Sequence, residues 1–409
     1  MRRCVRVALV AGVLAALAAS GVASSATGPE LPPPSPQAPA SPQAPASPQA
    51  PAKPDPAAAG PRQQVGTFEQ VDTALGYQPG AARSARFHYP GAEYVKVHLR
   101  RLALLPGDYL TVSDPTGAET HRYRAGGRWA MSVTGDTAVL TLHRTGPVPS
   151  GAAAQLARLG ALVDRVARGT APAEPPPADR VPESVCGRND SRDAVCYRSR
   201  YPTIYRNTKP VARLLIDGVE LCTAFRVGTG NRLLTNHHCL ASSAQARRTE
   251  VWFNYQCATC GGWGVFRPTK VRGDRVLDTD RVLDFTLFTV DDFGPVEQFG
   301  QLELDDRSAR AGEELYIPQH PAGLPTRVAL NSDQARGGSC AVADPRAHGY
   351  GWYTDVSYYC DTQGGSSGSP VLSRNSHRVV ALHHLGGCPN SGVRMDLIHD
   401  RIADWLQPS

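Results

Sequence analysis

The chain has 409 residues, enough for two or three domains of ordinary size. Its 43 Lys and Arg exceed its 37 Asp and Glu by only six, and this charge is spread along the sequence, which gives no reason to expect a nucleic-acid partner. The 39 glycines follow no period of three, which excludes collagen, and together with 35 prolines they interrupt the sequence too often for a single helical bundle.

Residues 1–26 have the pattern of a secretory signal peptide. Three arginines precede an apolar run over residues 7–19, and small residues up to Ala26 offer cleavage sites. The alternative is an uncleaved anchor helix, but the run is shorter than the roughly 20 residues that a membrane span needs. We therefore expect a secreted, extracellular protein with no membrane association after the signal is cleaved.

The cysteines agree with export. Cys4 lies in the signal, and the other nine of the ten cysteines fall between Cys186 and Cys388. This density in a secreted segment is typical of a disulfide-bonded domain. Because nine is an odd number, one thiol should be left over or pair elsewhere.

Residues 27–62 are predicted to form a Pro-rich linker. The stretch 29–61 holds 13 of the 35 prolines, no aromatic residue, and three copies of Ser-Pro-Gln-Ala-Pro-Ala. A segment of this composition cannot build a core and favours an extended tether.

Residues 63–150 are predicted to form a β-sandwich-like domain. Val95, Val97 and Leu99 alternate with polar residues, which is the period of a half-buried strand, and turns rich in Gly and Pro divide the segment. The segment contains no cysteine and no evident catalytic cluster. We therefore expect an accessory domain or a pro-domain.

The segment 151–183 is predicted to be a helix followed by a linker. Apolar residues recur there at helical spacing, at Leu156, Leu159, Leu162, Val163 and Val166. Four prolines between residues 172 and 177 then predict the second linker.

Residues 184–409 form the cysteine-rich unit. Short alternating strands and frequent Gly turns predict an all-β domain. At its end, residues 396–406 carry apolar side chains at helical spacing, which predicts a terminal helix docked on the β core.

Three fragments of this unit carry the residue types of nucleophilic catalysis, in the order His, Asp, Ser. They are residues 233–239 with His237 and His238, residues 283–288 with Asp284 before an apolar strand, and the Gly-rich turn at 364–368. A serine hydroxyl needs an imidazole to take its proton, and the imidazole needs a buried carboxylate to orient it. The carbonyl oxygen under attack needs two backbone N–H groups, which a Gly-rich turn can bring close.

These fragments resemble the motifs of chymotrypsin-fold (trypsin-like) serine endopeptidases. Thr-Asn-His-His-Cys is similar to the family's Thr-Ala-Ala-His-Cys, which makes His238, and not His237, the catalytic histidine. Asp284 matches the family's Asp-Ile-Ala-Leu, and Gly-Ser-Ser-Gly-Ser-Pro matches Gly-Asp-Ser-Gly-Gly-Pro, which makes Ser367 the nucleophile. The resemblance implies an oxyanion hole built from the backbone N–H groups of Gly365 and Ser367.

The Gly-Gly-Ser-Ser-Gly-Ser-Pro turn and Gln-His-Pro-Ala-Gly at 319–323 are most similar to the bacterial lysyl- and glutamyl-endopeptidase branch. The resemblance covers about 184–409 and implies a double β-barrel with the triad between the barrels. It also implies a secreted endopeptidase that acts on protein or peptide substrates through an acyl-enzyme, without a cofactor. The alternatives are a secreted binding protein on the same fold and an esterase, although no Gly-x-Ser-x-Gly elbow follows a βαβ pattern.

Ser366 departs from the family pattern. Many animal members have an aspartate directly before the nucleophile, which pairs with a newly freed N-terminal amine and activates the zymogen. A serine at this position cannot form that pair. We therefore expect any zymogen control to come from the N-terminal segment.

The resemblance implies a disulfide between Cys222 and Cys239, and Cys340 and Cys360 enclose a loop just before the nucleophile turn. We expect Cys222 to bond Cys239 and Cys340 to bond Cys360, and we also predict Cys186 with Cys388 and Cys196 with either Cys257 or Cys260. The alternative, in which Cys257, Cys260, His237, His238 and Cys239 bind zinc, is disfavoured in an exported protein, so no metal is expected.

Residues near the nucleophile disagree about the specificity pocket. Asp361 lies six positions before Ser367, where trypsin-like enzymes place the aspartate that binds Arg or Lys of the substrate. Thr362 and His383 occupy positions that resemble the pair recognising an acidic side chain in glutamyl endopeptidases. We favour cleavage after Arg or Lys, with an acidic or neutral specificity as alternatives. Cys360 could also turn Asp361 away, which would leave it as a structural hydrogen-bond acceptor.

Overall fold

The computed structural model describes residues 62–126, 128–147, 156–170, 184–262 and 264–406. The predicted signal peptide, nearly all of the Pro-rich linker, and the second linker lie outside these ranges. Within them, the structure contains no helix with the length and apolar character of a membrane span. The described chain is mostly β, as predicted.

The N-terminal domain consists of two antiparallel sheets around one hydrophobic core. One sheet has the order β2-β10-β4-β7, with β8 also on β4, and the other has the order β3-β9-β5-β6. Val95, Val97 and Leu99 are fully buried in this core, as their alternation predicts. The β-sandwich-like prediction is therefore confirmed. The strands are β2 (Gly66–Leu75), β3 (Ser84–His88), β4 (Tyr94–Ala103), β5 (Tyr109–Ser113), β6 (Thr120–Tyr123), β7 (Arg128–Trp129), β8 (Val133–Thr134), β9 (Thr137–His143) and β10 (Gly160–Gly169).

The helix predicted within 151–183 is wrong, because the chain forms strand β10 there. This strand pairs with both β2 and β4, so the sandwich continues past residue 150. Its register shifts between Val163 and Arg165, which is the mark of a β-bulge. The bulge leaves Val163 and Val166 on the same buried face although they are three positions apart. With this bulge, buried apolar residues of a strand recur three positions apart, a spacing that is otherwise typical of a helix.

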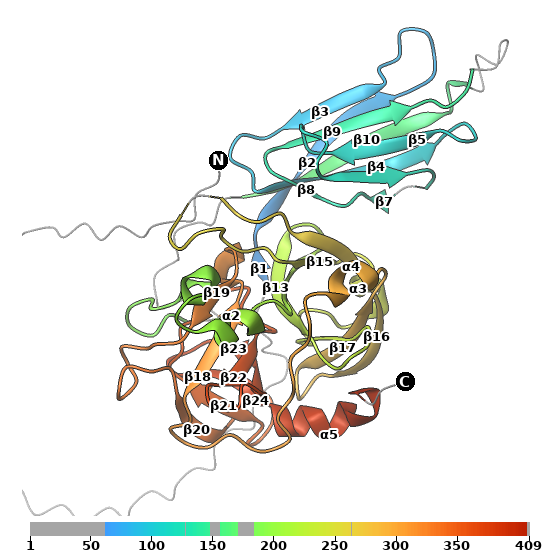
Figure 1. Cartoon of the computed structure of the whole chain (residues 1–409). Helices are drawn as coiled ribbons and strands as arrows, with labels where there is room; N and C mark the ends of the chain where they lie inside the picture. Colours follow the sequence, from blue (N-terminus) through green and yellow to red (C-terminus); the bar gives the residue numbers. More distant parts are fainter. Residues whose placement is uncertain (1–61, 127, 148–155, 171–183, 263, 407–409) are drawn as a thin grey trace, which may run out of the picture. The chain divides into compact units, whose positions relative to one another are not determined.

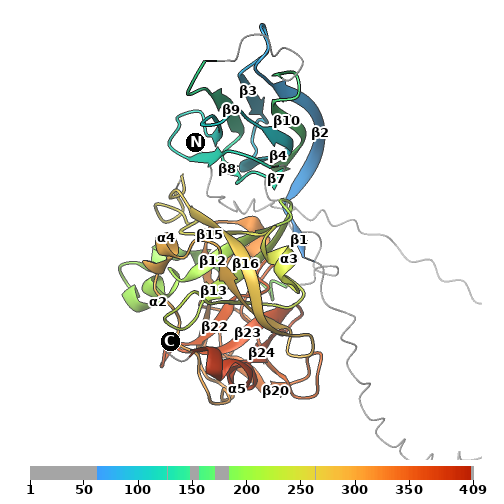
Figure 2. The ribbon, with the colours of Figure 1, turned by 90° about the vertical axis from the view of Figure 1, so that its right-hand side faces the viewer.

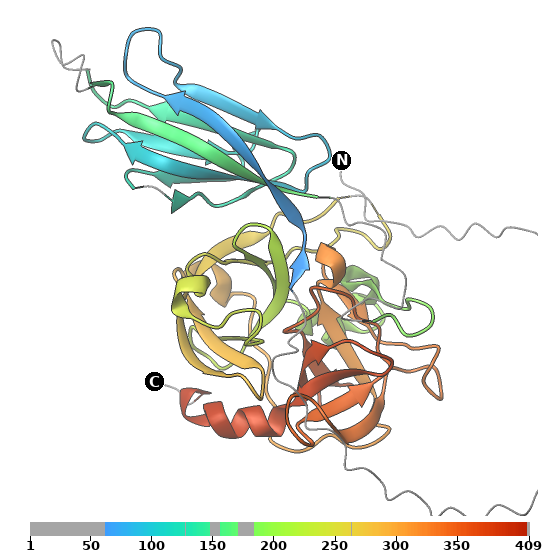
Figure 3. The same ribbon diagram turned by 180° about the vertical axis from the view of Figure 1, so that it is seen from behind.

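The first barrel of the C-terminal domain is closed. Its strands follow the order β13-β12-β15-β16-β17-β14, and a pairing of β13 with β14 closes the ring. A further short strand, β1 (Gln63–Gln64), extends β13 outside the ring, and Figure 3 shows that β2 continues directly from it. The barrel strands are β12 (Val211–Ile216), β13 (Glu220–Arg226), β14 (Leu233–Thr235), β15 (Glu250–Phe253), β16 (Thr269–Asp280) and β17 (Phe285–Val290).

The second barrel is built from an eight-stranded antiparallel sheet in the order β11-β19-β18-β22-β23-β24-β21-β20. Figure 1 shows strands β18 to β24 grouped in the orange and red part of the chain. They are β11 (Arg192–Asp193), β18 (Leu315–Gln319), β19 (Arg327–Ala329), β20 (Val342–Ala347), β21 (Asp355–Tyr358), β22 (Pro370–Ser373), β23 (Val379–Leu385) and β24 (Asn390–Arg394). Short helices connect the strands: η2 (Ala194–Tyr197), α2 (Pro202–Asn207), α3 (Ser243–Ala246), α4 (Gly294–Glu297) and η3 (Pro321–Gly323).

The terminal helix α5 (Met395–Leu406) covers one side of the domain, as Figure 2 shows. Met395, Ile398 and Ile402 are fully buried on its inner face. They belong to a core cluster that also holds Phe225 from the first barrel and Leu382 from the second. The helix thus helps to hold the two barrels together, and the predicted all-β double barrel with a terminal helix is confirmed.

Four disulfides connect eight of the described cysteines. Cys222–Cys239, Cys340–Cys360 and Cys186–Cys388 are present as expected. Cys196 bonds Cys260, with Cα atoms 4.7 Å apart, and not Cys257. The structure therefore corrects the pairing of Cys196 with Cys257, which the spacing of two neighbouring cysteines could not exclude.

Buried ion pairs join residues of the N-terminal sandwich and the first barrel. The Lys96 ammonium contacts the Glu250 carboxylate, and both side chains are at most 2% exposed. Ser132 donates to Glu250 from its backbone N–H (2.9 Å) and its hydroxyl (2.6 Å). These contacts show why Lys96 is buried although it lies at a polar position of a strand that was predicted to be half-buried.

Candidate active site

His238 and Asp284 come together because the strands beside them are paired. His238 follows β14 and Asp284 precedes β17, and Thr235 lies opposite Thr286 in that pair. The Asp284 carboxylate accepts from His238 twice, from the backbone N–H at 2.9 Å and from ring Nδ1 at 2.7 Å. Asn236 fixes the backbone by donating its side-chain N–H to the Asp284 carbonyl at 2.9 Å. This geometry leaves Nε2 as the imidazole nitrogen able to accept a proton from a substrate-side group.

Asp284 is an ionised, buried carboxylate. It is 1% exposed and has a φ of +40°, a backbone conformation that aspartate tolerates better than most residues. Burial by itself would raise the pKa of Asp284, but His238 and His384 outweigh that effect through charge and hydrogen bonds and hold the pKa well below its usual value. A charged Asp284 is what a catalytic imidazole needs for the correct tautomer.

His237 has a different environment. Its Nδ1 lies 2.9 Å from the hydroxyl of Thr279, on strand β16, and burial lowers its pKa. His237 thus contacts a threonine on β16, whereas the His238 ring contacts Asp284. This agrees with the assignment of the catalytic role to His238.

Ser367 lies in a turn that requires two glycines. Gly365 and Gly368 have φ of +97° and +87°, and a Cβ at Gly365 would overlap Leu221, while one at Gly368 would overlap the Thr223 carbonyl. The turn is tied to β13, because the Thr223 N–H donates to the Ser367 carbonyl at 2.8 Å. Cys239 Sγ lies 3.9 Å from the same carbonyl oxygen.

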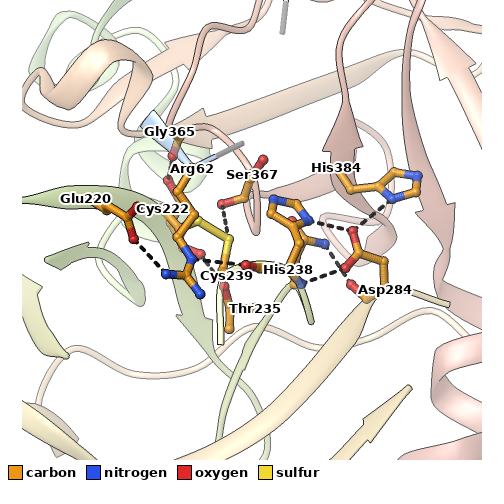
Figure 4. Close-up of a disulfide and its surroundings, with 12 residues drawn as sticks. Arg62, Glu220, Cys222, Thr235, His238, Cys239, Asp284, Gly365, Ser367 and His384 are labelled. Atoms are coloured by element: carbon orange, nitrogen blue, oxygen red, sulfur yellow. Dashed lines mark hydrogen bonds and ion pairs between the residues drawn. A yellow bond between two sulfur atoms is a disulfide. The ribbon is translucent and has the colours of Figure 1, made fainter. Parts of the chain in front are cut away.

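Figure 4 shows Ser367 beside the His238 ring, and the contact with Cys239 places the serine next to the residue that follows His238. All three predicted triad residues are thus brought to one place from three different loops. The Gly365 carbonyl is held by the Thr223 hydroxyl at 2.8 Å, which fixes the turn that carries the two predicted oxyanion-hole residues.

Ser366 is held by a neutral partner. Its hydroxyl donates to the side-chain oxygen of Gln319 at 2.5 Å, and the Gln319 side-chain N–H donates to the Asp361 carbonyl at 2.7 Å. Gln319 is fully buried at the end of β18. This chain of hydrogen bonds fastens the serine turn without the amine–carboxylate pair that the sequence excludes.

A second histidine contacts Asp284 and was not singled out from the sequence. His384 Nδ1 lies 3.1 Å from Asp284 Oδ2, and His384 Nε2 lies 2.7 Å from Asp355 Oδ2 (Figure 4 shows the first contact). Burial by itself would lower the pKa of His384, but the Asp355 charge and hydrogen bonds to both carboxylates raise it to about 10. His384 is therefore a buried cation between two carboxylates, and Asp355 lies on β21, beyond the range of any local motif.

The structure does not support Asp361 as the floor of a basic-specificity pocket. Its carboxylate accepts from the backbone N–H groups of Cys186 (3.1 Å) and Asp190 (2.7 Å). Burial raises its pKa to about 6, against the opposing effect of those two hydrogen bonds. Asp361 acts as a structural acceptor that fastens the start of the domain, which was the alternative considered from the sequence.

Thr362 and His383 stay next to the serine turn. The His383 N–H donates to the Ser369 carbonyl at 3.0 Å, and the Gly368 N–H donates to the His383 carbonyl at 2.9 Å. His383 is fully buried, with Nδ1 2.8 Å from the Tyr358 hydroxyl, and burial lowers its pKa to about 3. The Thr362 hydroxyl is buried without a hydrogen-bond partner among the described residues.

Several of the residues considered as zinc ligands are instead part of disulfides. Cys222, His238 and Cys239 lie within 4.8 Å of one another in the described part of the chain, but the two sulfurs are joined as a disulfide. Cys260 is bonded to Cys196. A disulfide sulfur cannot serve as a thiolate ligand, so these groups do not fit a zinc ion.

Residues 222–382 match the family model for the trypsin-like peptidase domain. This region is a trypsin-like peptidase domain. It includes all three candidate triad residues, strands β14 to β17 of the first barrel and strands β18 to β22 of the second. The match therefore covers the part of the chain that holds the candidate active site.

Two curated relatives match part of the chain. It is 38% identical over 229 residues to the secreted RxLR effector protein 73 of Plasmopara viticola, which covers 52% of this chain and 53% of that protein. It is 31% identical over 182 residues to the uncharacterized protein y4fB of Sinorhizobium fredii, which covers 42% and 26%. The chain thus spans about half or less of the length of these relatives.

Two solved structures are also similar. A Glu endopeptidase in complex with MPD gives a TM-score of 0.40 at 19% identity, covering 54% of this chain and 98% of that one. The inactive form of Rv3671c from M. tuberculosis gives 0.38 at 14% identity, covering 52% and 96%.

Proposed function

We propose that the protein is a secreted serine endopeptidase that hydrolyses peptide bonds through an acyl-enzyme. The observation that carries the proposal is the double hydrogen bond from His238 to the buried Asp284, next to the Gly-rich turn of Ser367. In this proposal Ser367 attacks the substrate carbonyl, and His238 takes the hydroxyl proton at Nε2 and returns it to the leaving amine. Asp284 stabilises the imidazolium that forms in between.

The oxyanion of the tetrahedral intermediate would be held by the N–H groups of Gly365 and Ser367. Because Thr223 and Gln319 fix the turn, these donors need little rearrangement during the reaction. Donors that are already in place are the largest single source of catalysis in acyl transfer. Water then attacks the acyl-enzyme with His238 as the base.

Secretion is supported by two observations. Residues 1–26 have the signal-peptide pattern, and four disulfides connect residues of the C-terminal domain. The first relative above carries the word secreted in its own name. Expression in the source organism followed by N-terminal sequencing of the protein from the medium tests this part. An intact N-terminus found only inside the cell would contradict it.

For specificity, we propose cleavage after an acidic residue, in place of the basic residue favoured from the sequence. Asp361 offers its carboxylate to two backbone N–H groups, whereas the buried Thr362 hydroxyl has no partner among the described residues. A hydroxyl in that position gains a hydrogen bond when a substrate carboxylate arrives, and the buried neutral His383, at the position that resembles its partner in glutamyl endopeptidases, can donate as well. The pocket then rejects side chains that would leave these groups unpaired.

Peptides that differ only in the residue before the cleaved bond test both the endopeptidase activity and the proposed acidic specificity. We expect hydrolysis after Glu or Asp, a loss of about tenfold in kcat/KM for Thr362→Val, and no change in preference for Asp361→Asn. If the protein cuts after Arg and Lys and these cuts disappear in Asp361→Asn, Asp361 is the floor of a basic-specificity pocket after all. If the folded protein hydrolyses none of these peptides, the endopeptidase proposal itself is wrong.

A further inference from the structure

The first described residues, 62–65, lie against the active site. Strand β1 pairs antiparallel with β13, with Gln63 opposite Leu221 and Gln64 opposite Glu220. The Val65 N–H donates to the Val219 carbonyl at 2.7 Å, one step further along. Because Cys222 lies on β13 and is bonded to Cys239 next to His238, this pairing sets segment 62–65 beside the catalytic histidine.

Arg62 contacts the catalytic loop directly. Its Nε donates to the His238 carbonyl at 3.0 Å, and its Nη1 lies 2.6 Å from a Glu220 carboxylate oxygen. Figure 4 shows Arg62 between the Gly365 turn and the Cys222–Cys239 disulfide. Only 18% of the Arg62 side chain is exposed, so this is a fitted contact rather than a loose surface pair.

Gln63 covers the serine turn. A Cβ at Gly364 would overlap the Gln63 side chain, so the two residues are in close contact one position before the predicted oxyanion donor Gly365. Val65 is 5% exposed and packs with Leu221 in a hydrophobic cluster. The segment is therefore fixed at both ends, by an ion pair near His238 and by a buried side chain further away.

The direction of the chain decides which part of a substrate the segment imitates. Arg62 is nearest to His238, and the chain then runs past Leu221 and Glu220 away from it. In peptide hydrolysis the leaving half begins at the cleaved bond and runs away from the nucleophile toward its C-terminus. Segment 62–65 has the polarity of that leaving half, with Arg62 in the place of its first residue.

We propose that the edge of β13 and the Glu220 carboxylate form the subsite for the leaving half of the substrate, with arginine favoured as its first residue. Segment 62–65 occupies this subsite in the intact chain and blocks substrates that extend into it. The proposal rests on the proposed endopeptidase function. A substrate cannot use the backbone groups of Leu221 and Val219 while β1 and Val65 hold them, because strand addition to one edge is exclusive.

Two substrates with the same acyl half test the block in the full chain. The short one ends in a nitroanilide and has no leaving-half residues, and the extended one continues as Ala-Gln-Gln-Val amide. Arg62→Ala removes both the ion pair and the hydrogen bond to His238. We expect it to raise the ratio of kcat/KM for the extended over the short substrate about tenfold, the effect of losing one partly buried charged contact.

Arg100→Ala is the matched control, since Arg100 is an exposed arginine of the same N-terminal domain. It should leave the ratio unchanged. If Arg62→Ala also leaves the ratio unchanged while both substrates are cleaved, segment 62–65 does not block the subsite and the proposal fails.

The preference for arginine is tested in the Arg62→Ala background with Arg or Gln first in the leaving half. We expect the Arg substrate to be favoured about tenfold, and Glu220→Gln to abolish the preference. Equal rates for both substrates with Glu220 present would overturn the subsite assignment.

A binding measurement separates this proposal from the endopeptidase proposal. Fluorescently labelled Arg-Gln-Gln-Val amide should bind the Arg62→Ala, Ser367→Ala double variant about tenfold more tightly than Ala-Gln-Gln-Val amide. This holds even if no variant hydrolyses a peptide. Equal affinity for the two peptides would contradict the subsite.

Discussion

His384→Asn removes an imidazole that is fully buried between Asp284 and Asp355. Taking away one member of a buried, hydrogen-bonded charge group leaves the others uncompensated, which costs about 3–5 kcal/mol in measured cases. Asparagine can still donate one hydrogen bond, so we expect the lower end, about 3 kcal/mol less free energy of unfolding at pH 6.

The sign of the pH dependence follows from the raised pKa. His384 has its pKa raised from 6.5 to about 10, against burial, by the Asp355 charge and by hydrogen bonds to both carboxylates. A group of this kind contributes its full stability below pH 6.5 and loses it as the pH rises toward 10. The difference between the native chain and His384→Asn should therefore shrink between pH 6.5 and 10.

Urea denaturation at pH 6, 8 and 10 measures this difference. His399→Asn is the control, since His399 lies on α5, and it should change the free energy of unfolding by less than about 1 kcal/mol at each pH. A loss for His384→Asn below about 1 kcal/mol at pH 6, or one that is the same at pH 6 and pH 10, would refute the buried cation.

Three further changes probe the active site and its support. His238→Ala should lower kcat by on the order of 10⁶, while His237→Ala, which loses only a contact with a threonine, should stay within about tenfold, and the reverse ranking would move the triad by one residue. Gly365→Ala should lower kcat by about 10²–10³ in steady-state kinetics, because a Cβ there displaces the turn that carries the oxyanion donor, and full activity would reassign that donor. Replacing Cys340 and Cys360 by alanine should cost about 3 kcal/mol in urea denaturation through the freed 20-residue loop, and an unchanged midpoint would show that the bond adds nothing.

Much of the domain could be predicted because its motifs are local. His238, Asp284 and Ser367 each lie in a short fragment whose residue types have a chemical reason to occur together, and the strands beside them alternate or are fully apolar. Cysteine pairing could be predicted where the fold resemblance gives a partner, as for Cys222. The sequence could not decide whether Cys196 bonds Cys257 or Cys260, because two cysteines three positions apart reach nearly the same place.

Other features depend on contacts that no local pattern records. The bulge near Val163 shifts the alternation of β10 and makes a strand resemble a helix. The Asp361 carboxylate accepts from the backbone of residues 186–190, which lies more than 170 positions earlier. His384 gains its charge from Asp355 on β21, a neighbour only because β24 pairs with both β21 and β23.

The contact of segment 62–65 with His238 has the same origin. Arg62 stands at the end of a Pro-rich stretch and shows no pattern of its own, so the sequence predicts only a linker there. Its position follows from the open edge of β13, which accepts two residues as an added strand.

The most direct test of the central claim is to label the full chain with a fluorophosphonate and map the modified residue by peptide mass spectrometry. We expect the label on Ser367, lost in Ser367→Ala and strongly reduced in His238→Ala, while Ser366→Ala keeps it on Ser367. A label on another serine, or none on the folded protein, would contradict the assignment of Ser367 as the nucleophile.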